Sequence, residues 1–201
     1  MSKGMLIVVS GPSGCGKGTI LKEIRKDDNF YYSVSATTRL PREGEVDGVH
    51  YQFLRNEDFE ELIKSGGMLE YASYCGNYYG SPKKSALEML EQGKDVILEI
   101  EVQGALQVKK SFPDAMFIFI LPPSVKELRR RLEKRGTETE EKINKRVAQA
   151  ENEIKQAVNY DYVMINGDLD EAVNELKSII CAEKCTIKRA ENKIYEVLEN
   201  A

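Results

Sequence analysis

The chain lacks any long apolar segment. No apolar run approaches the roughly 20 residues that a membrane-spanning helix needs. The N-terminal sequence MSKGMLIVVSG contains a short apolar run, but a glycine-rich turn follows it where an export signal would have a small-residue cleavage site. We therefore expect neither membrane insertion nor export, and interpret this run as the first strand of the fold.

Cysteine and histidine are also scarce. The four cysteines, Cys15, Cys75, Cys181 and Cys185, have no spacing typical of a disulfide framework, which favours reduced thiols in a cytoplasmic protein. Two of them are four residues apart, but a structural zinc site normally uses four ligands. His50, the single histidine, matches no motif and is expected to be a surface or structural residue.

The sequence has no excess of positive charge. It contains 29 Lys and Arg against 33 Asp and Glu, a formal net charge of −4. Nucleic-acid-binding proteins normally have a basic surface, so no nucleic-acid partner is expected and any anion site must be local. Linkers, repeats and low-complexity tracts are not evident. A length of 201 residues suits one domain with insertions.

Short apolar runs alternate with helical patterns along the chain. The run at 5–9 is rich in β-branched residues and is followed by a helical stripe of Ile20, Leu21 and Ile24. Further strand candidates lie at 96–98, 116–121 and 162–165, and helical patterns at 85–92, 124–134, 138–159 and 169–184. The alternation predicts an α/β fold with a mostly parallel sheet. Residues 35–81 break the rhythm and indicate a β-rich insertion, whereas the role of a polar last helix at 187–198 stays open.

A glycine-rich loop separates the first strand from the first helix. It comprises Gly11, Pro12, Ser13, Gly14, Cys15, Gly16, Lys17, Gly18 and Thr19, the position and spacing of a P-loop. Glycines let backbone N–H groups approach phosphate oxygens, and the helix N-terminus adds positive potential. Lys17 is expected to reach the β- and γ-phosphates of ATP; the alternative is a turn with a solvated lysine. The sequence leaves open whether Cys15 makes this loop sensitive to oxidation.

One position departs from the general P-loop pattern, which places Ser or Thr directly after the lysine. Gly18 stands there, and Thr19 follows it. Mg²⁺ is therefore expected to be held through water and nucleotide phosphates, with Thr19 or Glu99 as candidate protein contacts. Glu99 and Glu101 lie two residues apart at the end of a predicted strand, so both carboxylates should project to one face.

Two arginines, Arg39 and Arg42, flank Pro41 three residues apart, a spacing suited to holding one phosphate from two sides. Tyr51, Glu70 and the sequence 77–81 follow. With the P-loop, these motifs resemble the guanylate kinase family over almost the whole chain, and 135–141 and 144–146 resemble that family's mobile lid. The resemblance implies a P-loop kinase core (1–34, 82–124 and 160–201), a GMP-binding insertion (35–81) and a helical lid (about 125–159).

The resemblance also implies roles for individual residues. The GMP phosphate would be held by Arg39, Arg42, Tyr51 and Tyr79, and the base by Ser35, Glu70 and Ser81. Arg135 and Arg146 would reach the triphosphate from the lid, so that Lys17, Arg39, Arg135 and Arg146 form the catalytic set. Glu101 replaces the family's usual Asp in the acceptor site. Which of Glu99 and Glu101 serves magnesium and which serves the guanine side stays open.

The function implied is transfer of the γ-phosphoryl group of ATP to GMP, with Mg²⁺ as the metal and dGMP as a further acceptor. Closure is expected about hinges near Ser35, Ser81 and Ser124. One alternative is a kinase of the same architecture acting on another phosphorylated sugar or nucleotide. Another is a catalytically inactive guanylate-kinase-like module that binds proteins, although such modules typically lose the ATP cradle. No obligate protein partner is evident.

Overall fold

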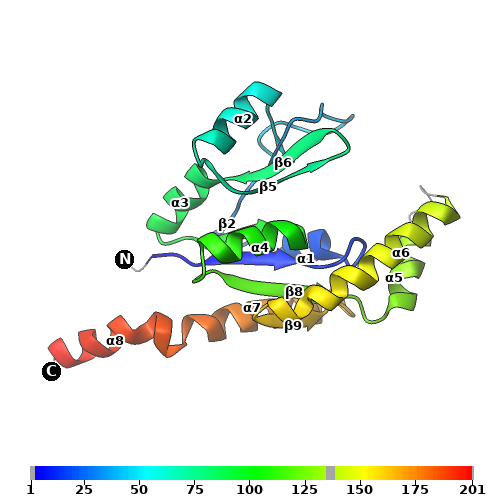
Figure 1. Cartoon of the computed structure of the whole chain (residues 1–201). Coiled ribbons are helices and arrows are strands. Elements are labelled where there is room, and N and C mark those ends of the chain that lie inside the picture. Colours follow the sequence, from blue (N-terminus) through cyan, green and yellow to red (C-terminus); the bar gives the residue numbers. More distant parts are fainter. Residues whose placement is uncertain (1–2, 135–138, 201) are drawn as a thin grey trace.

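Five parallel strands form the central sheet of the computed structural model, which describes residues 3–134 and 139–200 (Figure 1). Their spatial order is β2 (Phe30–Tyr32), β7 (Asp95–Glu99), β1 (Leu6–Ser10), β8 (Met116–Leu121) and β9 (Tyr162–Ile165). All four neighbouring pairs are parallel. The predicted α/β class and the four predicted strands are confirmed, whereas β2 was not predicted from the sequence.

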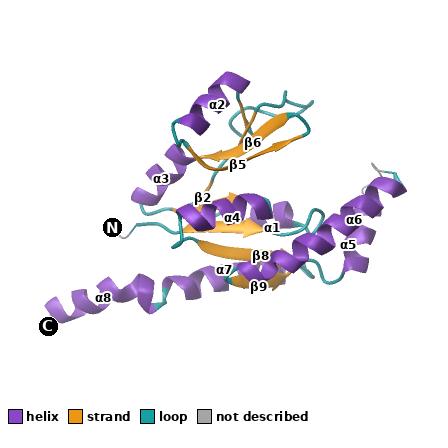
Figure 2. Ribbon diagram, in the orientation of Figure 1, coloured by secondary structure: helices purple, strands orange, loops and turns teal. Residues whose placement is uncertain are grey.

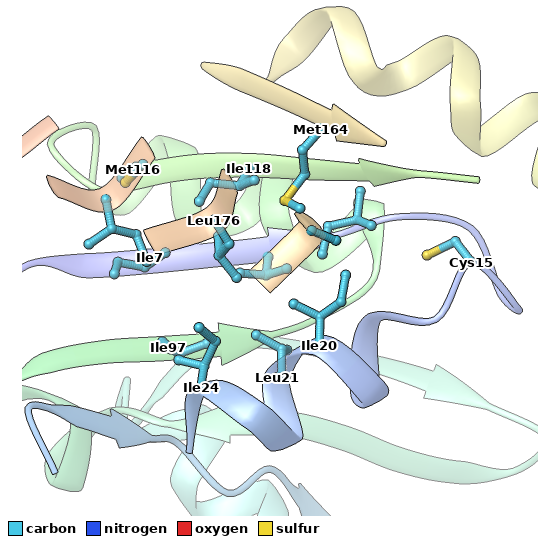
Figure 3. Close-up of a cluster of buried hydrophobic side chains, with 14 of the residues drawn as sticks. Ile7, Cys15, Ile20, Leu21, Ile24, Ile97, Met116, Ile118, Met164 and Leu176 are labelled. Atoms are coloured by element: carbon cyan, nitrogen blue, oxygen red, sulfur yellow. The ribbon is translucent and has the colours of Figure 1, made fainter. Parts of the chain in front are cut away.

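The sheet is covered by helices on both faces (Figure 2). Ile7 and Val9 of β1 pack toward α1 (Lys17–Ile24) and α7 (Leu169–Lys184), in the cluster that Figure 3 shows. Leu6 and Val8 point the other way, toward α3 (Lys83–Glu91) and α4 (Val102–Ser111). Successive side chains of a strand alternate between faces, so a strand buried on both sides needs an unbroken apolar run. The apolar run at 5–9 therefore encodes a central strand.

A second, smaller sheet is inserted between β2 and α3. Its order is β4 (Gln52–Phe53), β3 (Ala36–Thr37), β6 (Asn77–Pro82) and β5 (Met68–Tyr74). Strand β6 is antiparallel to both β5 and β3, whereas β3 and β4 are parallel. The helix α2 (Asn56–Lys64), not predicted from the sequence, packs on this sheet through buried Phe59, whose ring stacks on Tyr78 at 5.3 Å between centroids. The β-rich insertion thus has its own small core.

The edge strand β5 of this second sheet is hydrogen-bonded to α4, a helix that packs on the five-stranded sheet. The Gln107 side chain donates from Nε2 to the Tyr71 carbonyl (2.9 Å), and its Oε1 accepts from the Tyr71 N–H (3.2 Å). A single side-chain amide thereby satisfies both backbone groups of Tyr71. The two sheets are consequently joined by this contact as well as by the chain connections.

Two helices, α5 (Val125–Lys134) and α6 (Glu140–Lys155), form an arm beside the end of the sheet where β1 leads into the glycine-rich loop (Figure 1). They pack together through Leu128, Leu132, Ile143 and Ala150. A short 3₁₀ segment, η1 (Gln156–Asn159), follows α6. The predicted helical patterns at 124–134 and 138–159 are confirmed within the described residues, and Arg135 lies outside them.

The last helix, α8 (Ile187–Glu199), continues from α7 and extends away from the sheets (Figure 1). None of its described side chains is buried. Among residues 3–134 and 139–200, no helix combines the length and apolar character needed to span a membrane.

Candidate active site

A cavity of about 310 Å³ lies where the carboxyl ends of β1 and β7 meet the glycine-rich loop, the inserted sheet and the arm. Its lining comprises Gly11, Ser13, Lys17, Tyr32, Ser35, His50, Tyr51, Glu99, Ile100, Glu101, Val102, Gln149 and Glu153. Ligands of open α/β sheets bind outside the carboxyl ends of the strands, which is where this cavity lies. Predicted phosphate-binding and acceptor residues therefore share one cavity.

The backbone of the glycine-rich loop requires glycine at specific positions. Gly14 and Gly16 have φ angles of 94° and 95°, in the left-handed region that residues with a Cβ rarely adopt. A Cβ at Gly16 would also collide with the amide of Asn166. Helix α1 begins at Lys17, so the last residues of the loop form a helix N-terminus, which attracts anions.

Lys17 reaches back over the loop into the cavity. Its Nζ donates to the carbonyl of Gly11 at 2.5 Å and to that of Pro12 at 3.4 Å. These carbonyls hold the ammonium group above the loop, close to Ser13, which also lines the cavity. Lys17 thus lines the cavity, and its contact with nucleotide phosphates stays a prediction.

Two residues that sequence reasoning missed brace the loop from behind. The Cys15 carbonyl accepts a hydrogen bond from Asn166 Nδ2 at 2.7 Å and one from Arg131 Nη1 at 3.1 Å. Arg131 also donates to the Asn166 carbonyl at 3.0 Å and to Glu127 at 2.9 Å. Asn166 directly follows β9, and a polar residue directly after an apolar parallel strand was the available sequence signal.

Cys15 itself is fully buried beneath the loop. Burial raises the pKa of its thiol, a shift that the nearby Lys17 charge only partly offsets. The thiolate is the reactive form of cysteine, so a buried thiol with a raised pKa is poorly reactive. The arrangement therefore argues against Cys15 as an oxidation-sensitive residue.

Glu99, at the end of β7, lies beside the glycine-rich loop. The Tyr32 hydroxyl donates to its Oε2 at 2.9 Å, and a Cβ at Gly18 would lie 3.9 Å from its Oε1. Thr19 is exposed and does not line the cavity, whereas Glu99 and Glu101 both do. Mg²⁺ prefers one or two carboxylates together with phosphate oxygens and water, and this pair of carboxylates fits that donor set better than Thr19 does.

Arg39 is held by a residue that the sequence analysis gave no role. Its guanidinium donates to both carboxylate oxygens of Glu45, at 2.9 and 3.0 Å, and lies 5.5 Å from the ring centroid of Tyr51. The hydrogen bonds from Arg39, with that from the Arg42 N–H, lower the pKa of Glu45 to about 2. The rings of Tyr51 and Tyr79 pack edge to face, with 6.2 Å between their centroids. Three residues predicted to hold the GMP phosphate, Arg39, Tyr51 and Tyr79, therefore lie together beside the cavity. The Arg42 side chain is exposed.

Glu70 and Ser81 face each other on paired strands β5 and β6. The Ser81 hydroxyl donates to Glu70 Oε1 at 2.7 Å, and both residues are buried. Burial raises the pKa of Glu70, while the Ser81 hydrogen bond opposes the shift. The two residues predicted to hold the guanine base therefore lie together, but neither of them lines the 310 Å³ cavity.

The arm contributes Arg146, Gln149 and Glu153 from α6. The guanidinium of Arg146 donates to the Ser13 hydroxyl of the glycine-rich loop, and Gln149 and Glu153 line the cavity. Arg146 therefore reaches the predicted triphosphate site from a separate element. His50 also lines the cavity, and its Nδ1 accepts a hydrogen bond from the Val46 N–H at 3.0 Å.

The layered sheet, its inserted second sheet and the glycine-rich loop at the cavity define a nucleotide-binding α/β protein of the kinase class. The guanylate kinase family model matches residues 3–183. The chain is 54% identical to the guanylate kinase of Clostridium tetani over 96% of its own length and 93% of that protein. It is 53% identical to that of Lactiplantibacillus plantarum over 99% of its length and 98% of that protein.

A solved structure supports the same conclusion. The crystal structure of guanylate kinase from Anaplasma phagocytophilum aligns with a TM-score of 0.74 at 34% identity, covering 94% of this chain and 90% of that one. The chain belongs to the guanylate kinase family. The family resemblance drawn from the sequence motifs is thereby confirmed.

Proposed function

We propose that this protein transfers the γ-phosphoryl group of ATP to GMP, giving ADP and GDP, and that dGMP is a further acceptor. The observation that carries the proposal is the shared cavity, where Lys17 and the glycine-rich loop face Ser35 and Tyr51 of the acceptor side. Phosphoryl transfer between two bound nucleotides needs such a meeting of donor and acceptor sites. Membership of the family supports the same reaction.

In this proposal, catalysis depends on positioning and on neutralising negative charge. Backbone N–H groups between Gly11 and Thr19, except at Pro12, which has none, bind the ATP phosphates. Lys17 exchanges the Gly11 carbonyl for the transferring phosphoryl group. Arg39 and Arg42, with Tyr51 and Tyr79, hold the phosphate of GMP. Arg146 and Arg135 add positive charge from the arm. No phosphorylated enzyme intermediate is needed, because GMP attacks directly.

Bound with ATP, Mg²⁺ would offset charge on the β- and γ-phosphates, with Glu99 and Glu101 as the candidate residues to hold it through water. The Tyr32 hydroxyl orients the Glu99 carboxylate toward Gly18. Gly18 leaves room there that a Ser or Thr side chain of the general P-loop pattern would fill. Glu101 lies closer to the acceptor side than Glu99 does, and it could contact the guanine or ribose of GMP instead of Mg²⁺.

Selection of guanine is assigned to Glu70, Ser81 and Ser35. Guanine presents N1–H and N2–H₂ donors that one carboxylate can accept, and serine hydroxyls can donate to O6 or N7. Adenine lacks the matching donors and would leave buried Glu70 unpaired, which costs about 1–3 kcal/mol. The discrimination expected from this contact is a factor of roughly ten to a few hundred.

We assign the core to 1–34, 82–124 and 160–201, the GMP-binding insertion to 35–81 and the lid to about 125–159, with hinges near Ser35, Ser81 and Ser124. Closing the insertion and lid over the cavity would bring Glu70 and Ser81 to its wall and exclude water that would otherwise hydrolyse ATP. We place the protein in the cytoplasm, with ATP and GMP as its ligands and no nucleic acid or membrane partner.

A coupled assay of ADP release tests the proposal with GMP, dGMP, AMP, CMP and UMP as separate acceptors. We expect ADP release with GMP and, more slowly, with dGMP. Faster turnover with another monophosphate would reassign the acceptor. Absence of ADP release with all five, from protein that binds GMP by calorimetry, would instead favour an inactive binding module, an alternative that the intact glycine-rich loop and Lys17 argue against.

A further inference from the structure

Tyr32, the last residue of β2, lines the cavity and contacts Glu99 there. Its hydroxyl donates to Oε2 of Glu99 at 2.9 Å, and Glu99 lines the same cavity. Burial and the neighbouring Glu99 charge raise the pKa of Tyr32, so the hydroxyl keeps its proton and acts as a donor. Phenylalanine would satisfy the packing of the ring equally well. The hydroxyl therefore adds one specific contact, and that contact is to Glu99.

The ring of Tyr32 is held in place by its surroundings. The pairing of β2 with β7 sets Tyr32 beside Ile97, two residues before Glu99, and the ring packs against the core cluster on that face of the sheet. Arg25, which follows α1, places its guanidinium carbon 3.2 Å from the ring centroid. Cation–π contacts of this kind are favourable. The position of the hydroxyl is consequently well defined.

The Glu99 side chain lies where a carboxylate needs such a restraint. A Cβ at Gly18 would be 3.9 Å from Glu99 Oε1, so this oxygen lies beside the first turn of α1. The positive potential of a helix N-terminus attracts carboxylates, and a glutamate side chain has several rotamers. The hydrogen bond from Tyr32 to Oε2 selects one of them. Oε1 is thereby directed toward the place where the ATP phosphates are expected.

We propose that Tyr32 is a positioning residue for phosphoryl transfer, whose hydroxyl holds Glu99 so that Oε1 accepts hydrogen bonds from the water shell of Mg²⁺ bound with ATP. This inference rests on the ATP-to-GMP reaction proposed above. Residues that orient a metal-binding carboxylate contribute to metal affinity without touching the metal. Strand β7 ends at Glu99, and Glu101 is the N-cap residue of α4, so Glu99 keeps the strand geometry that sets it beside Tyr32.

Calorimetric titration of ATP into the full chain tests the proposal. Tyr32→Phe removes the hydroxyl and keeps the ring. With Mg²⁺ present, its affinity for ATP should fall about tenfold, the low end of the range for residues that orient metal ligands. In EDTA its affinity should stay within about twofold of the wild type, because the glycine-rich loop and Lys17 are unchanged. Tyr31→Phe, whose ring packs on the opposite face of β2, is the matched control and should bind like the wild type in both buffers.

A double-mutant cycle identifies the group through which Tyr32 acts. In a Glu99→Ala background, Tyr32→Phe should cause less than about a twofold further loss of affinity with Mg²⁺, because its partner is already absent. In a Glu101→Ala background, it should cause the full loss. Arg25→Gln, which keeps the hydroxyl but removes the charge beside the ring, is a second variant. It should lower the affinity about threefold with Mg²⁺ and leave that in EDTA unchanged.

Three results would overturn the proposal. Equal losses of ATP affinity with Mg²⁺ and in EDTA would mean that Tyr32 contacts the nucleotide or supports the fold. Wild-type affinity of Tyr32→Phe with Mg²⁺ would mean that the hydroxyl has no positioning role. A full loss in the Glu99→Ala background would mean that Tyr32 acts through another group. The titrations contain no GMP, so failure of this proposal is distinguishable from failure of the ADP-release assay.

Discussion

The carboxylate of Glu70 lies directly against Gly104, the third residue of α4. A Cβ at Gly104 would be 2.5 Å from Glu70 Oε2 and 3.0 Å from its carboxyl carbon, closer than van der Waals contact allows. The glycine therefore provides the space in which the carboxylate is buried and hydrogen-bonded by Ser81. Helix α4, which packs on the five-stranded sheet, thus positions the Glu70 side chain of the inserted sheet.

Gly104→Ala should displace Glu70 and impair GMP recognition. Loss of the Ser81 hydrogen bond and of the carboxylate position is worth about 1–2 kcal/mol, so the KM for GMP should rise about tenfold. The KM for ATP should change less than about twofold, since Gly104 is not in the glycine-rich loop. Gly167→Ala, which has open space around its Cβ, is the control in steady-state assays. An unchanged KM for GMP would contradict this positioning role.

Glu70→Gln should raise the melting temperature and lower the affinity for GMP. Burial raises the pKa of Glu70 from its ordinary value of 4.5, so the native state binds the proton more tightly than the unfolded chain does. The free energy of unfolding therefore falls as pH rises from the unfolded pKa through the raised native pKa. Glutamine avoids this cost, and the melting temperature of the variant should exceed that of the wild type at pH 7.5.

The difference in melting temperature should shrink at pH 4, where Glu70 is protonated in both states. Calorimetry at both pH values measures the effect, and GMP affinity of Glu70→Gln should fall at the same time. A variant that is less stable than the wild type at pH 7.5 would mean that the buried carboxylate is net stabilising.

Asn166→Ala should weaken ATP binding through the glycine-rich loop. The substitution removes the 2.7 Å hydrogen bond to the Cys15 carbonyl and leaves Arg131 alone to hold it. Loosening this buried carbonyl costs about 1–2 kcal/mol, so the KM for ATP should rise about tenfold while the KM for GMP stays within about twofold. Asn174→Ala, at an exposed position of α7, is the matched control. Equal increases in both KM values would point to general unfolding.

Arg146→Ala should lower kcat by about 100-fold, the size typical for loss of one preorganised charge at a transition state. The binding of ATP measured by calorimetry should weaken much less than turnover falls, because the charge is needed most when the phosphoryl group transfers. Lys145→Ala removes a neighbouring charge whose partner is Glu141, on the same helix, and should keep wild-type turnover. Wild-type turnover in Arg146→Ala would remove this residue from the mechanism.

Iodoacetamide should label Cys75, Cys181 and Cys185, which are exposed, well before Cys15. Burial and the raised pKa keep Cys15 as an unreactive thiol, so mass spectrometry after brief treatment at pH 7.5 should find the three exposed thiols alkylated and activity retained. Rapid modification of Cys15 with loss of activity, prevented by ATP, would show that the loop opens readily.

The sequence predicted the parts of the fold whose signal is local. The unbroken apolar run at 5–9 and the glycines beside Lys17 specify a buried strand and an anion-binding turn through their own chemistry. The three-residue strand β2 was missed because Phe30–Tyr32 is too short to show a period, and α2 because a β-rich pattern surrounds it. Brief elements take their conformation from the sheet or partner on which they pack.

The parts of the site that depend on distant residues could not be predicted. Asn166 and Cys15 are 151 positions apart in the chain, and the pairing of β8 with both β1 and β9 brings them together. The contact between Glu45 and Arg39 is local, yet nothing in the pattern distinguished Glu45 from the other charges of its loop. Motifs therefore identify the groups that meet substrates, while tertiary structure identifies the groups that position them.

The hydrogen bonds between Gln107 and Tyr71 also bear on solubility. Strand β5 is the outer strand of its sheet, and an outer strand with unpaired N–H and C=O groups can template association with other chains. Gln107 occupies both groups of Tyr71 in mid-strand, and α4 lies alongside. Gln107→Leu should therefore promote aggregation during refolding, a consequence for handling the protein that is separate from any effect on its chemistry.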